Sequence, residues 1–348
     1  MPGFASIVDQ ERPIRILTAL LHHGTLPHAL LFTGIEGVGK RAVANALALA
    51  CNCLKKNSGY TPEIKNTRGI TAQRIKDPYS SVGPCGSCKA CRKIESGNHP
   101  DIIQVKPTGP FIKIAQVRAL CDTLAMKPYE ASTRVVIIHD AQCMNPAASN
   151  ALLKILEEPP QQTMLILIAT QTLDLLPTVV SRCQHIRFNP ISKKKLENLL
   201  VEQHGLDSDD AMAIATMANG SLSRAIAMHQ ANWVNQRNWI LEEINGLSSR
   251  PIGRILAFAE RLSRDKDTIL ETLEVINSWL RDLMMAKFYP EKIINQDIAG
   301  DIQLASQKKS VPSLLSKMEL VQATQNSIRA NTNLRLTLEV MLMKLAKS

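Results

Sequence analysis

The sequence predicts an α/β protein with a parallel, doubly wound sheet, followed by an entirely helical part. Three short apolar runs, at residues 29–33, 135–138 and 164–169, have the composition of buried strands. Helical stretches follow the first two runs, so strands and helices alternate as crossovers between parallel strands require. After Pro190 the sequence contains no further strand-like run, and amphipathic helices take over.

The first predicted strand leads into a glycine-rich turn and a helix. Residues 29–33 (ALLFT) form an apolar run that Gly34 ends. Residues 41–50 are rich in alanine and leucine and contain no helix breaker, which predicts a helix directly after the turn. Residues 54–84 are rich in Lys, Asn, Thr, Ser, Gly and Pro without a sustained period, so we expect an inserted surface loop there.

Two further strands follow along the chain. Residues 135–138 (VVII) have the composition of a strand that is buried on both faces. A helical stretch over 147–158 comes next and stops at Pro159 and Pro160, because proline lacks the amide that a helix interior needs. Residues 164–169 (MLILIA) form the third strand.

The last third of the chain contains two apolar stripes at helical spacing. The first runs through residues 269–284 and the second through residues 334–345, where the apolar positions include Leu336 and Val340. Both stripes predict helices that pack one face against neighbouring helices. A contact with another subunit is the alternative for either stripe.

Composition and charge place the chain among ordinary globular proteins. Of its 348 residues 45% are hydrophobic and 21% are charged. The net charge of +10 indicates an anionic partner such as nucleic acid, or only good solubility. Residues 53–93 contain nine basic and two acidic side chains and so contribute much of this surplus. No apolar stretch reaches the roughly 18 residues of a membrane span, and the N-terminus lacks a signal-peptide pattern, so we expect a cytoplasmic protein.

Residues 34–41 (GIEGVGKR) match the phosphate-binding pattern Gly-x4-Gly-Lys. Gly34, Gly37 and Gly39 allow backbone amides to approach phosphate oxygens at a helix N-terminus, and Lys40 can pair with the β and γ phosphates. A chance glycine turn is the alternative. The position between a predicted strand and a predicted helix favours a phosphate loop.

Two positions that normally handle magnesium are altered. Arg41 stands where the phosphate-binding pattern has Ser or Thr, and a guanidinium is a donor that cannot coordinate a cation. After the strand at 135–138 an Asp-Glu pair would hold the metal and orient water, but the chain has His139 and Asp140. We therefore expect no magnesium site and no hydrolysis by this chain.

A cysteine cluster predicts a zinc site. Residues 85–91 (CGSCKAC) place three thiols at spacings of three residues, and a structural zinc site needs a fourth ligand to close a tetrahedron. Cys53, near the end of the helix after the phosphate loop, is the best candidate, with Cys51 and His99 as alternatives. Reduced, unliganded thiols are the competing interpretation. The predicted ligands are Cys53, Cys85, Cys88 and Cys91.

Four segments of the first 190 residues carry a family resemblance. They are residues 27–40 (PHALLFTGIEGVGK), the cysteine segment followed by residues 97–101 (GNHPD), residues 151–160 (ALLKILEEPP) and residues 176–183 (LPTVVSRC). Together they resemble bacterial clamp-loader subunits of the AAA+ family. The resemblance covers residues 1 to about 228, and the last third is similar only in pattern and through residues 333–345 (NLRLTLEVMLMKL).

The resemblance implies a domain organisation and an assembly. It implies a AAA+ P-loop domain over residues 1–189 with a zinc module at 51–93, a helical lid domain at 190–230 and a helical collar for oligomerisation at 231–348. It also implies a subunit of the DNA polymerase III clamp loader. Such a loader is a hetero-pentamer with gamma/tau and delta subunits that opens a sliding clamp and places it on primed DNA.

Three further residues receive roles through the resemblance. Arg182, in the sequence Ser-Arg-Cys, matches the arginine that reaches into the ATP site of a neighbouring subunit, with a surface salt bridge as the alternative. Thr170 matches a polar sensor near the γ-phosphate. Arg224 matches a second sensor on the lid and is a candidate for phosphate contact, with a structural role as the alternative.

These observations lead to one functional prediction and two alternatives. We predict a non-hydrolysing clamp-loader subunit that supplies Arg182 in trans and holds a structural Zn²⁺, while retention of ATP or ADP without turnover stays open. The first alternative is a self-sufficient AAA+ ATPase such as the gamma/tau motor, which requires magnesium-binding residues that this sequence lacks. The second is a zinc-dependent DNA-binding module, based on the basic residues between 53 and 93.

Overall fold

The computed structural model describes residues 3–55, 83–264 and 266–347. The chain divides into two compact units. The first unit comprises residues 1–195 together with 220–223, and the second comprises residues 196–219 together with 224–348. The predicted charge surplus at 53–93 falls partly on residues 56–82, which lie outside the described residues.

The first unit contains a five-stranded parallel sheet in the order β2-β3-β4-β1-β5. Its strands are β1 (Ala29–Thr33), β2 (Ile102–Val105), β3 (Arg134–Ile138), β4 (Thr163–Ala169) and β5 (Gln184–Arg187). The three strands predicted from apolar runs are the three central ones, and every one of their residues is buried. The predicted parallel α/β fold class is confirmed.

The edge strands β2 and β5 were not predicted. In β5 (QHIR) only Ile186 is buried, and in β2 (IIQV) only Val105 is. Edge strands of this kind lack the continuous apolar run by which the central strands are recognised, because one side of each faces no further strand.

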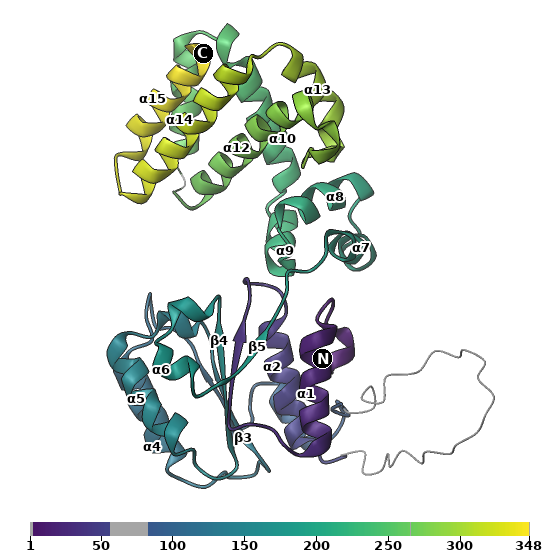
Figure 1. Cartoon of the computed structure of the whole chain (residues 1–348), viewed down its shortest axis with the longest axis vertical. Helices are drawn as coiled ribbons and strands as arrows, with labels where there is room; N and C mark the ends of the chain where they lie inside the picture. Colours follow the sequence, from purple (N-terminus) through teal and green to yellow (C-terminus); the bar gives the residue numbers. More distant parts are fainter. Residues whose placement is uncertain (1–2, 56–82, 265, 348) are drawn as a thin grey trace, which may run out of the picture. The chain divides into compact units, whose positions relative to one another are not determined.

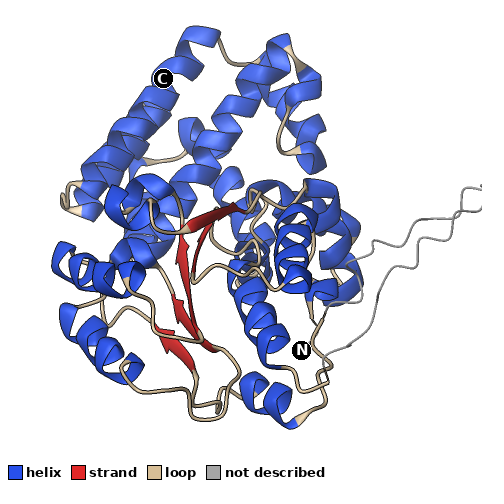
Figure 2. Cartoon of the chain, turned by 60° about the horizontal axis from the view of Figure 1, so that its bottom comes forward, coloured by secondary structure: helices blue, strands red, loops and turns tan. Residues whose placement is uncertain are grey.

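Helices cover both faces of the sheet. Figure 1 shows α1 and α2 on one side of the strands and α4, α5 and α6 on the other, and Figure 2 shows the strands from a second direction. The α-helices of this unit are α1 (Glu11–His23), α2 (Lys40–Asn52), α3 (Lys89–Glu95), α4 (Ile114–Leu124), α5 (Pro146–Glu157) and α6 (Pro177–Val180), and the short 3-10 helices are η1 (Phe4–Ser6), η2 (Ala141–Cys143) and η3 (Thr172–Asp174).

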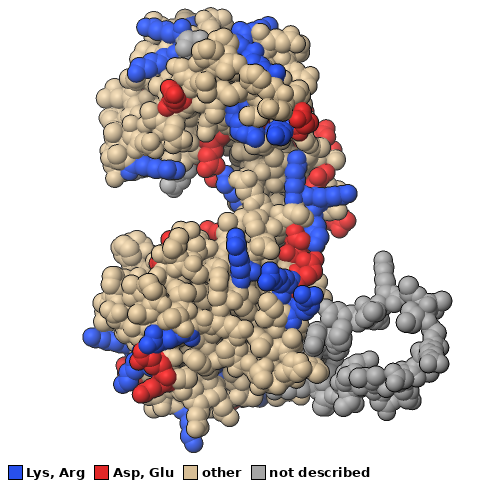
Figure 3. All heavy atoms as spheres, in the orientation of Figure 1, with Lys and Arg blue, Asp and Glu red and all other residues tan. Residues whose placement is uncertain are grey.

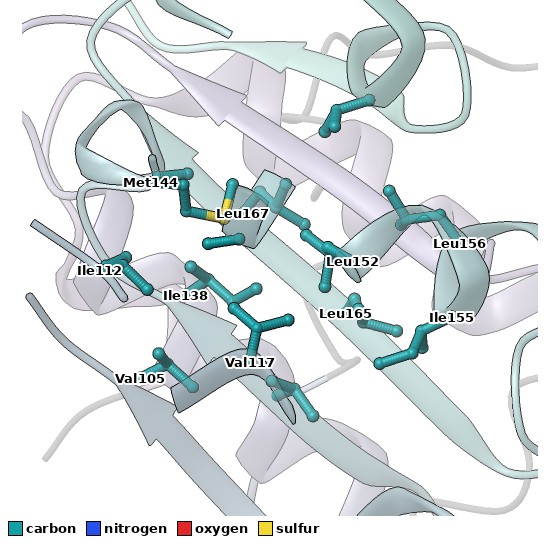
Figure 4. Close-up of a cluster of buried hydrophobic side chains, with 14 of the residues drawn as sticks. Val105, Ile112, Val117, Ile138, Met144, Leu152, Ile155, Leu156, Leu165 and Leu167 are labelled. Carbon is teal, nitrogen blue, oxygen red and sulfur yellow. The ribbon is translucent and has the colours of Figure 1, made fainter. Parts of the chain in front are cut away.

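Each face of the sheet carries its own hydrophobic core. Side chains alternate across a strand, so Leu31 of β1 belongs to the core under α4 and α5, whereas Leu30 and Phe32 belong to the core under α1 and α2. Figure 4 shows the first core, where Leu165 and Leu167 of β4 lie among side chains from α4, α5 and the neighbouring strands. These two cores hold the strand ends, and therefore the loops that follow them, in fixed positions.

The second unit is helical throughout its described part. Its α-helices are α7 (Lys193–His204), α8 (Ser208–Met217), α9 (Leu222–Gln230), α10 (Trp233–Gly246), α11 (Ile252–Ser263), α12 (Lys266–Phe288), α13 (Ala299–Gln307), α14 (Val311–Arg329) and α15 (Leu334–Lys347), with 3-10 helices η4 (Leu247–Ser249), η5 (Pro290–Lys292) and η6 (Gln296–Ile298). The first residues of α7 and α9 belong to the first unit. The separate lid and collar boundaries at 190–230 and 231–348 stay a prediction.

The two predicted apolar stripes of the last third differ in how much of each is buried. In α12, which contacts α13 and α14, most of the predicted stripe is buried, whereas Leu270 and Met284 are only half-buried. The buried positions are Ile269, Leu273, Ile276, Trp279, Leu280 and Leu283. In α15 the buried positions are Leu338, Met341, Leu342 and Leu345, while Leu336 and Val340 are 59% and 46% exposed. The predicted stripe of α15 was therefore too wide, because these two residues lie outside the arc that a packed helix face covers.

Buried polar contacts join the helices of the second unit. The Asp282 carboxylate is fully buried and accepts the backbone amides of Ile294 and Asn295 at 2.8 to 3.1 Å. The buried Arg237 guanidinium pairs with Asp297. These contacts fix the loop between α12 and α13. Within the described residues, no helix is both long enough and apolar enough to cross a membrane.

Candidate functional site

The glycines of the phosphate loop adopt conformations that other residues rarely reach. The loop connects β1 to α2, and Gly34, Gly37 and Gly39 have φ angles of 145°, 79° and 101°. The Gly34 amide donates to the carbonyl of Thr170 at 3.0 Å, which ties the loop to the end of β4. The backbone path of a phosphate loop is therefore present in this chain.

The lysine of the loop turns back onto its own backbone. The Lys40 ammonium donates to the carbonyl oxygens of Gly34 and Ile35, the latter at 2.8 Å. Lys40 is 7% exposed, and burial lowers its pKa to about 8. Lys40 thus donates to carbonyls of its own loop. In the phosphate-binding pattern the lysine at this position contacts the phosphates of a nucleotide.

A distant segment of the same unit covers the middle of the loop. The backbone amide of Leu222 donates to the Gly37 carbonyl at 3.1 Å. A Cβ atom on Gly37 would collide with Ser221 and lie 2.9 Å from the amide nitrogen of Ser223. Only glycine fits at residue 37, because the segment at 220–223 lies directly against it.

An ion pair joins the loop position that normally supplies a magnesium ligand to the position after β3 that normally orients water. The Arg41 guanidinium donates to the Asp140 carboxylate at 2.8 Å. Asp140 has a φ of 49°, in the left-handed region, directly after β3. A cation held by these residues would have to displace a permanently charged side chain. The donor set at the loop therefore does not fit a magnesium–nucleotide complex.

His139 contributes to the same arrangement. It is 3% exposed, its Nε2 lies 3.1 Å from the Gln104 Oε1, and its Nδ1 is buried without a partner among the described residues. Burial, with the nearby positive charges of Arg41 and Lys106, lowers the His139 pKa to about 4. The side chain is a neutral, buried imidazole near neutral pH.

The two residues matched to nucleotide sensors have partners within their own units. The Thr170 hydroxyl donates to the Asp174 carboxylate at 2.8 Å. The Arg224 guanidinium pairs with Glu274 at 2.6 Å, from α9 to α12 in the second unit. The sensor roles of both residues stay predictions.

Arg182 lies just after α6 and is held by two acceptors. Its Nη1 donates to the Thr178 carbonyl at 3.0 Å, and its Nη2 lies 2.7 Å from the Glu157 carboxylate at the end of α5. The side chains of Arg182 and Glu157 are 36% and 51% exposed. An exposed ion pair of this kind contributes about 0 to 1 kcal/mol to stability, so the guanidinium can change partners at little cost.

Four cysteine sulfurs meet beside α2 and α3. The Sγ atoms of Cys53, Cys85, Cys88 and Cys91 all lie within 4.8 Å of one another. Backbone amides point at these sulfurs: the Cys85 amide donates to Cys53 Sγ and the Cys88 amide to Cys85 Sγ, both at 3.3 Å. The two pieces of chain, at the end of α2 and the start of α3, are joined at this cluster.

The four thiols could hold a metal ion. Backbone amides of Ser87 and Cys88 lower the Cys85 pKa to about 6. Burial, and then the neighbouring Cys88 and Cys53 thiols, raise the Cys91 pKa to about 12. Four thiols cannot ionise together without a compensating charge, which a divalent cation supplies. A tetrahedral site with zinc–sulfur bonds of about 2.3 Å requires sulfurs roughly 3.8 Å apart, which lies within the 4.8 Å bound on these four.

The two alternative ligands lie elsewhere. Cys51, which is buried, packs with the core under α1 and α2. The His99 Nδ1 accepts the amide of Asp101 at 3.2 Å, and its Nε2 lies 3.8 Å from the Glu130 carboxylate. Neither residue belongs to the group of four sulfurs.

Asp101 of the GNHPD segment has a structural role that the sequence does not predict. The Asp101 carboxylate accepts the backbone amides of Tyr129, Glu130 and Ala131 at 2.8 to 2.9 Å. Arg134 is 4% exposed and donates to one carbonyl in the last turn of α4 and two in the loop that follows, while its Nε lies 3.5 Å from Asp101. This buried pair fixes the loop between α4 and β3, and no local sequence pattern links its two members.

Charged side chains on the visible face form small mixed groups. In Figure 3, Lys and Arg side chains on the first unit lie among uncharged surface and next to Asp and Glu. Within the first unit, the Lys195 ammonium contacts both Asp9 and Glu11 at 2.7 and 2.8 Å. This face does not present the continuous basic tract that a DNA-binding module requires.

Comparison with known families agrees with this fold and site. The family described as "DNA polymerase III, delta subunit" matches residues 9–81 and 70–192, more than half of the chain. The chain belongs to this DNA polymerase III subunit family. A second family, "DNA polymerase III, delta subunit, C terminal", matches residues 231–347. The predicted resemblance to clamp-loader subunits is confirmed.

Individual relatives show which kind of subunit the chain is most similar to. It is 28% identical over 341 residues to the DNA polymerase III subunit delta' of Bacillus subtilis, covering 97% of this chain and 96% of the relative. It is 28% identical to the delta' subunit of Pseudomonas aeruginosa, covering 92% of both chains. The tau subunit of Escherichia coli is 32% identical over 230 residues, which is 65% of this chain and 32% of that protein. The chain is a clamp-loader subunit of DNA polymerase III, and the similarity extends over full length to the delta' relatives.

Proposed function

We propose that this chain is a delta-prime-type subunit that does not hydrolyse ATP and that supplies Arg182 to the ATP site of a neighbouring clamp-loader subunit. The observation that carries the proposal is the ion pair between Arg41 and Asp140. Arg41 replaces the magnesium ligand of the chain's own loop and pairs with Asp140, which follows β3 in place of the water-orienting Glu. Catalysis by this family member therefore has to depend on what it offers to another chain.

The position of Arg182 supports a role in trans. The guanidinium lies outside the sheet, more than one third exposed, and has one exposed carboxylate partner. Its other terminal nitrogen, Nη1, donates to the Thr178 carbonyl on α6. An arginine whose guanidinium has only weak surface partners can exchange them for the γ-phosphoryl group of a neighbour, where it stabilises developing negative charge.

The remaining parts serve assembly. We propose that Cys53, Cys85, Cys88 and Cys91 hold one zinc ion, which is structural because four protein ligands leave no open coordination position. The helices after residue 230 would form the collar of a hetero-pentamer with gamma/tau and delta subunits. The complex would open a sliding clamp and load it on primed DNA in the cytoplasm.

Turnover by a reconstituted loader tests the arginine role. Arg182→Ala should lower turnover at the neighbouring site by about 10³-fold, which appears as loss of that site's share of DNA-stimulated ATP hydrolysis. Arg118→Ala is the matched control, since Arg118 is exposed on α4 and has no ion pair among the described residues. Size-exclusion chromatography checks that both variants still assemble. Unchanged turnover with Arg182→Ala would sink the assignment.

A second experiment addresses the alternative of a self-sufficient ATPase. The purified chain with magnesium and ATP should show no turnover above that of Lys40→Ala. Hydrolysis that Lys40→Ala abolishes would show that the loop rearranges to bind nucleotide and would overturn the proposal.

A further inference from the structure

A carboxylate at the end of α5 pairs with the arginine that the proposed function assigns to a neighbouring ATP site. Glu157 is the last residue of α5, and its carboxylate lies 2.7 Å from Nη2 of Arg182. The other terminal nitrogen, Nη1, donates to the Thr178 carbonyl of α6 at 3.0 Å. Both terminal nitrogens therefore have acceptors within this chain, and the guanidinium is held between the ends of two helices.

The backbone on each side of this ion pair is fixed by the hydrophobic core. Leu156, directly before Glu157, and Val179, three residues before Arg182, are both buried and belong to the same core. Figure 4 shows Leu156 at this core, and Figure 1 shows α5 and α6 on the same side of the sheet. The two exposed side chains can therefore rearrange without any movement of the helices that carry them.

The position of Glu157 is unfavourable for the helix itself. The C-terminus of an α-helix carries partial negative charge, so a carboxylate there is repelled and a cation beside it is attracted. Nevertheless α5 ends at Glu157, and Glu158 is its C-cap. Helix stability thus gives no reason for an acid at residue 157, whereas the pair with Arg182 does. For the same reason, an uncharged residue at this position should leave α5 intact.

The contact with Glu157 competes with contacts outside the chain. While Arg182 is paired with Glu157, the charge of its guanidinium is compensated on the surface of its own subunit. To form a forked pair with phosphate oxygens of another chain through Nη2, the side chain has to leave the carboxylate. The fraction of molecules in which it has left then sets the apparent affinity for the outside ligand.

We propose that Glu157 is a positioning residue that keeps Arg182 on its own subunit until the γ-phosphate bound by a neighbouring subunit takes over the guanidinium. This inference rests on the proposed function, because it requires Arg182 to act in trans. Glu157 thereby lowers the affinity of the neighbouring site for ATP but not for ADP, which has no γ-phosphate. An exposed ion pair shifts such an equilibrium by at most about fivefold.

Nucleotide binding to the reconstituted loader tests this inference. The site to follow is the one at which Arg182→Ala weakens binding of the non-hydrolysable ATP analogue AMP-PNP. At that site Glu157→Gln should strengthen AMP-PNP binding about twofold to fivefold and leave ADP binding unchanged. Glu158→Gln is the matched control, since it removes the same charge from the adjacent exposed residue, and it should change neither. An equal effect on both nucleotides, or no stronger binding of AMP-PNP, would overturn the proposal.

A double variant shows whether Glu157 acts through Arg182. In the Arg182→Ala background, Glu157→Gln should have no effect on AMP-PNP binding, because the side chain that it releases is gone. Stronger binding that persists in this background would contradict the proposal. Circular dichroism and size-exclusion chromatography check that each variant folds and assembles.

The same measurements separate the failure of this inference from the failure of the proposed function. If Arg182→Ala weakens AMP-PNP binding but Glu157→Gln does not strengthen it, only the role of Glu157 is wrong. If Arg182→Ala leaves AMP-PNP binding unchanged at every site, the role of Arg182 in trans is wrong, and the role of Glu157 is wrong with it.

Discussion

His139 gives the chain a specific pH dependence of stability. The imidazole is 3% exposed, and its Nδ1 has no partner among the described residues. Its pKa is about 4 in the folded chain, against 6.5 for an ordinary histidine. Between these two values the unfolded chain binds a proton that the folded chain does not. Stability therefore falls as the pH is lowered from about 6.5 towards 4.

The size of this effect follows from the two pKa values. One pKa unit corresponds to about 1.4 kcal/mol, so the full interval amounts to about 3 kcal/mol. His139→Gln is the matched variant, because glutamine can still form a hydrogen bond with Gln104 but does not titrate. Carboxylates with lowered pKa values, such as Asp9 and Asp101, lose their contributions mainly at still lower pH and do so in both proteins.

Urea unfolding of both proteins at several pH values measures the effect. Circular dichroism follows the whole chain. Tryptophan fluorescence follows only the second unit, since Trp233, Trp239 and Trp279 all lie there. The difference in unfolding free energy between wild type and His139→Gln should change by at least 2 kcal/mol between about pH 7 and pH 4.5. A difference that stays constant within about 0.5 kcal/mol would show that His139 is not a buried neutral imidazole.

Three further changes have defined outcomes. Cys53→Ser should weaken zinc binding at least tenfold by metal analysis, whereas Cys51→Ser should leave about one zinc per chain; the reverse pattern would assign the fourth ligand to Cys51. Asp101→Asn should cost about 3 to 5 kcal/mol in thermal unfolding, because it leaves a buried guanidinium unpaired, and a neutral result would contradict that account. Leu167→Ala should cost about 2 to 5 kcal/mol and Leu173→Ala, at an 89% exposed position, under about 0.5; similar costs would contradict the assigned core.

The central part of the fold could be predicted because its signal is local. The strands β1, β3 and β4 are buried on both faces, so each appears in the sequence as an uninterrupted apolar run. The edge strands β2 and β5 carry polar residues and could not be recognised in this way. Hydrophobic patterning therefore predicted the central strands of the sheet but not its two edge strands.

In the site, too, features formed by residues close in the sequence could be predicted, and contacts between distant residues could not. Three cysteines within residues 85–91 are visible as a spacing, but the choice between Cys51 and Cys53 depends on where α2 ends. Cys51 is still helical and turns into the core, whereas Cys53 follows the helix in extended conformation and reaches the other sulfurs. The contact between Arg41 and Asp140 joins residues 99 positions apart, and no local sequence pattern predicts such a pair.

The cysteine cluster also bears on how much the length of the segment between Cys53 and Cys85 can vary. Residues 54–84 separate Cys53 from Cys85, and a metal bound to both would close this stretch into a ring. In general, the entropy of closing a chain into a ring grows only with the logarithm of its length, so that doubling the number of residues costs about 0.6 kcal/mol. Insertions and deletions between the two cysteines should therefore be tolerated during evolution, while the four ligands themselves cannot be moved.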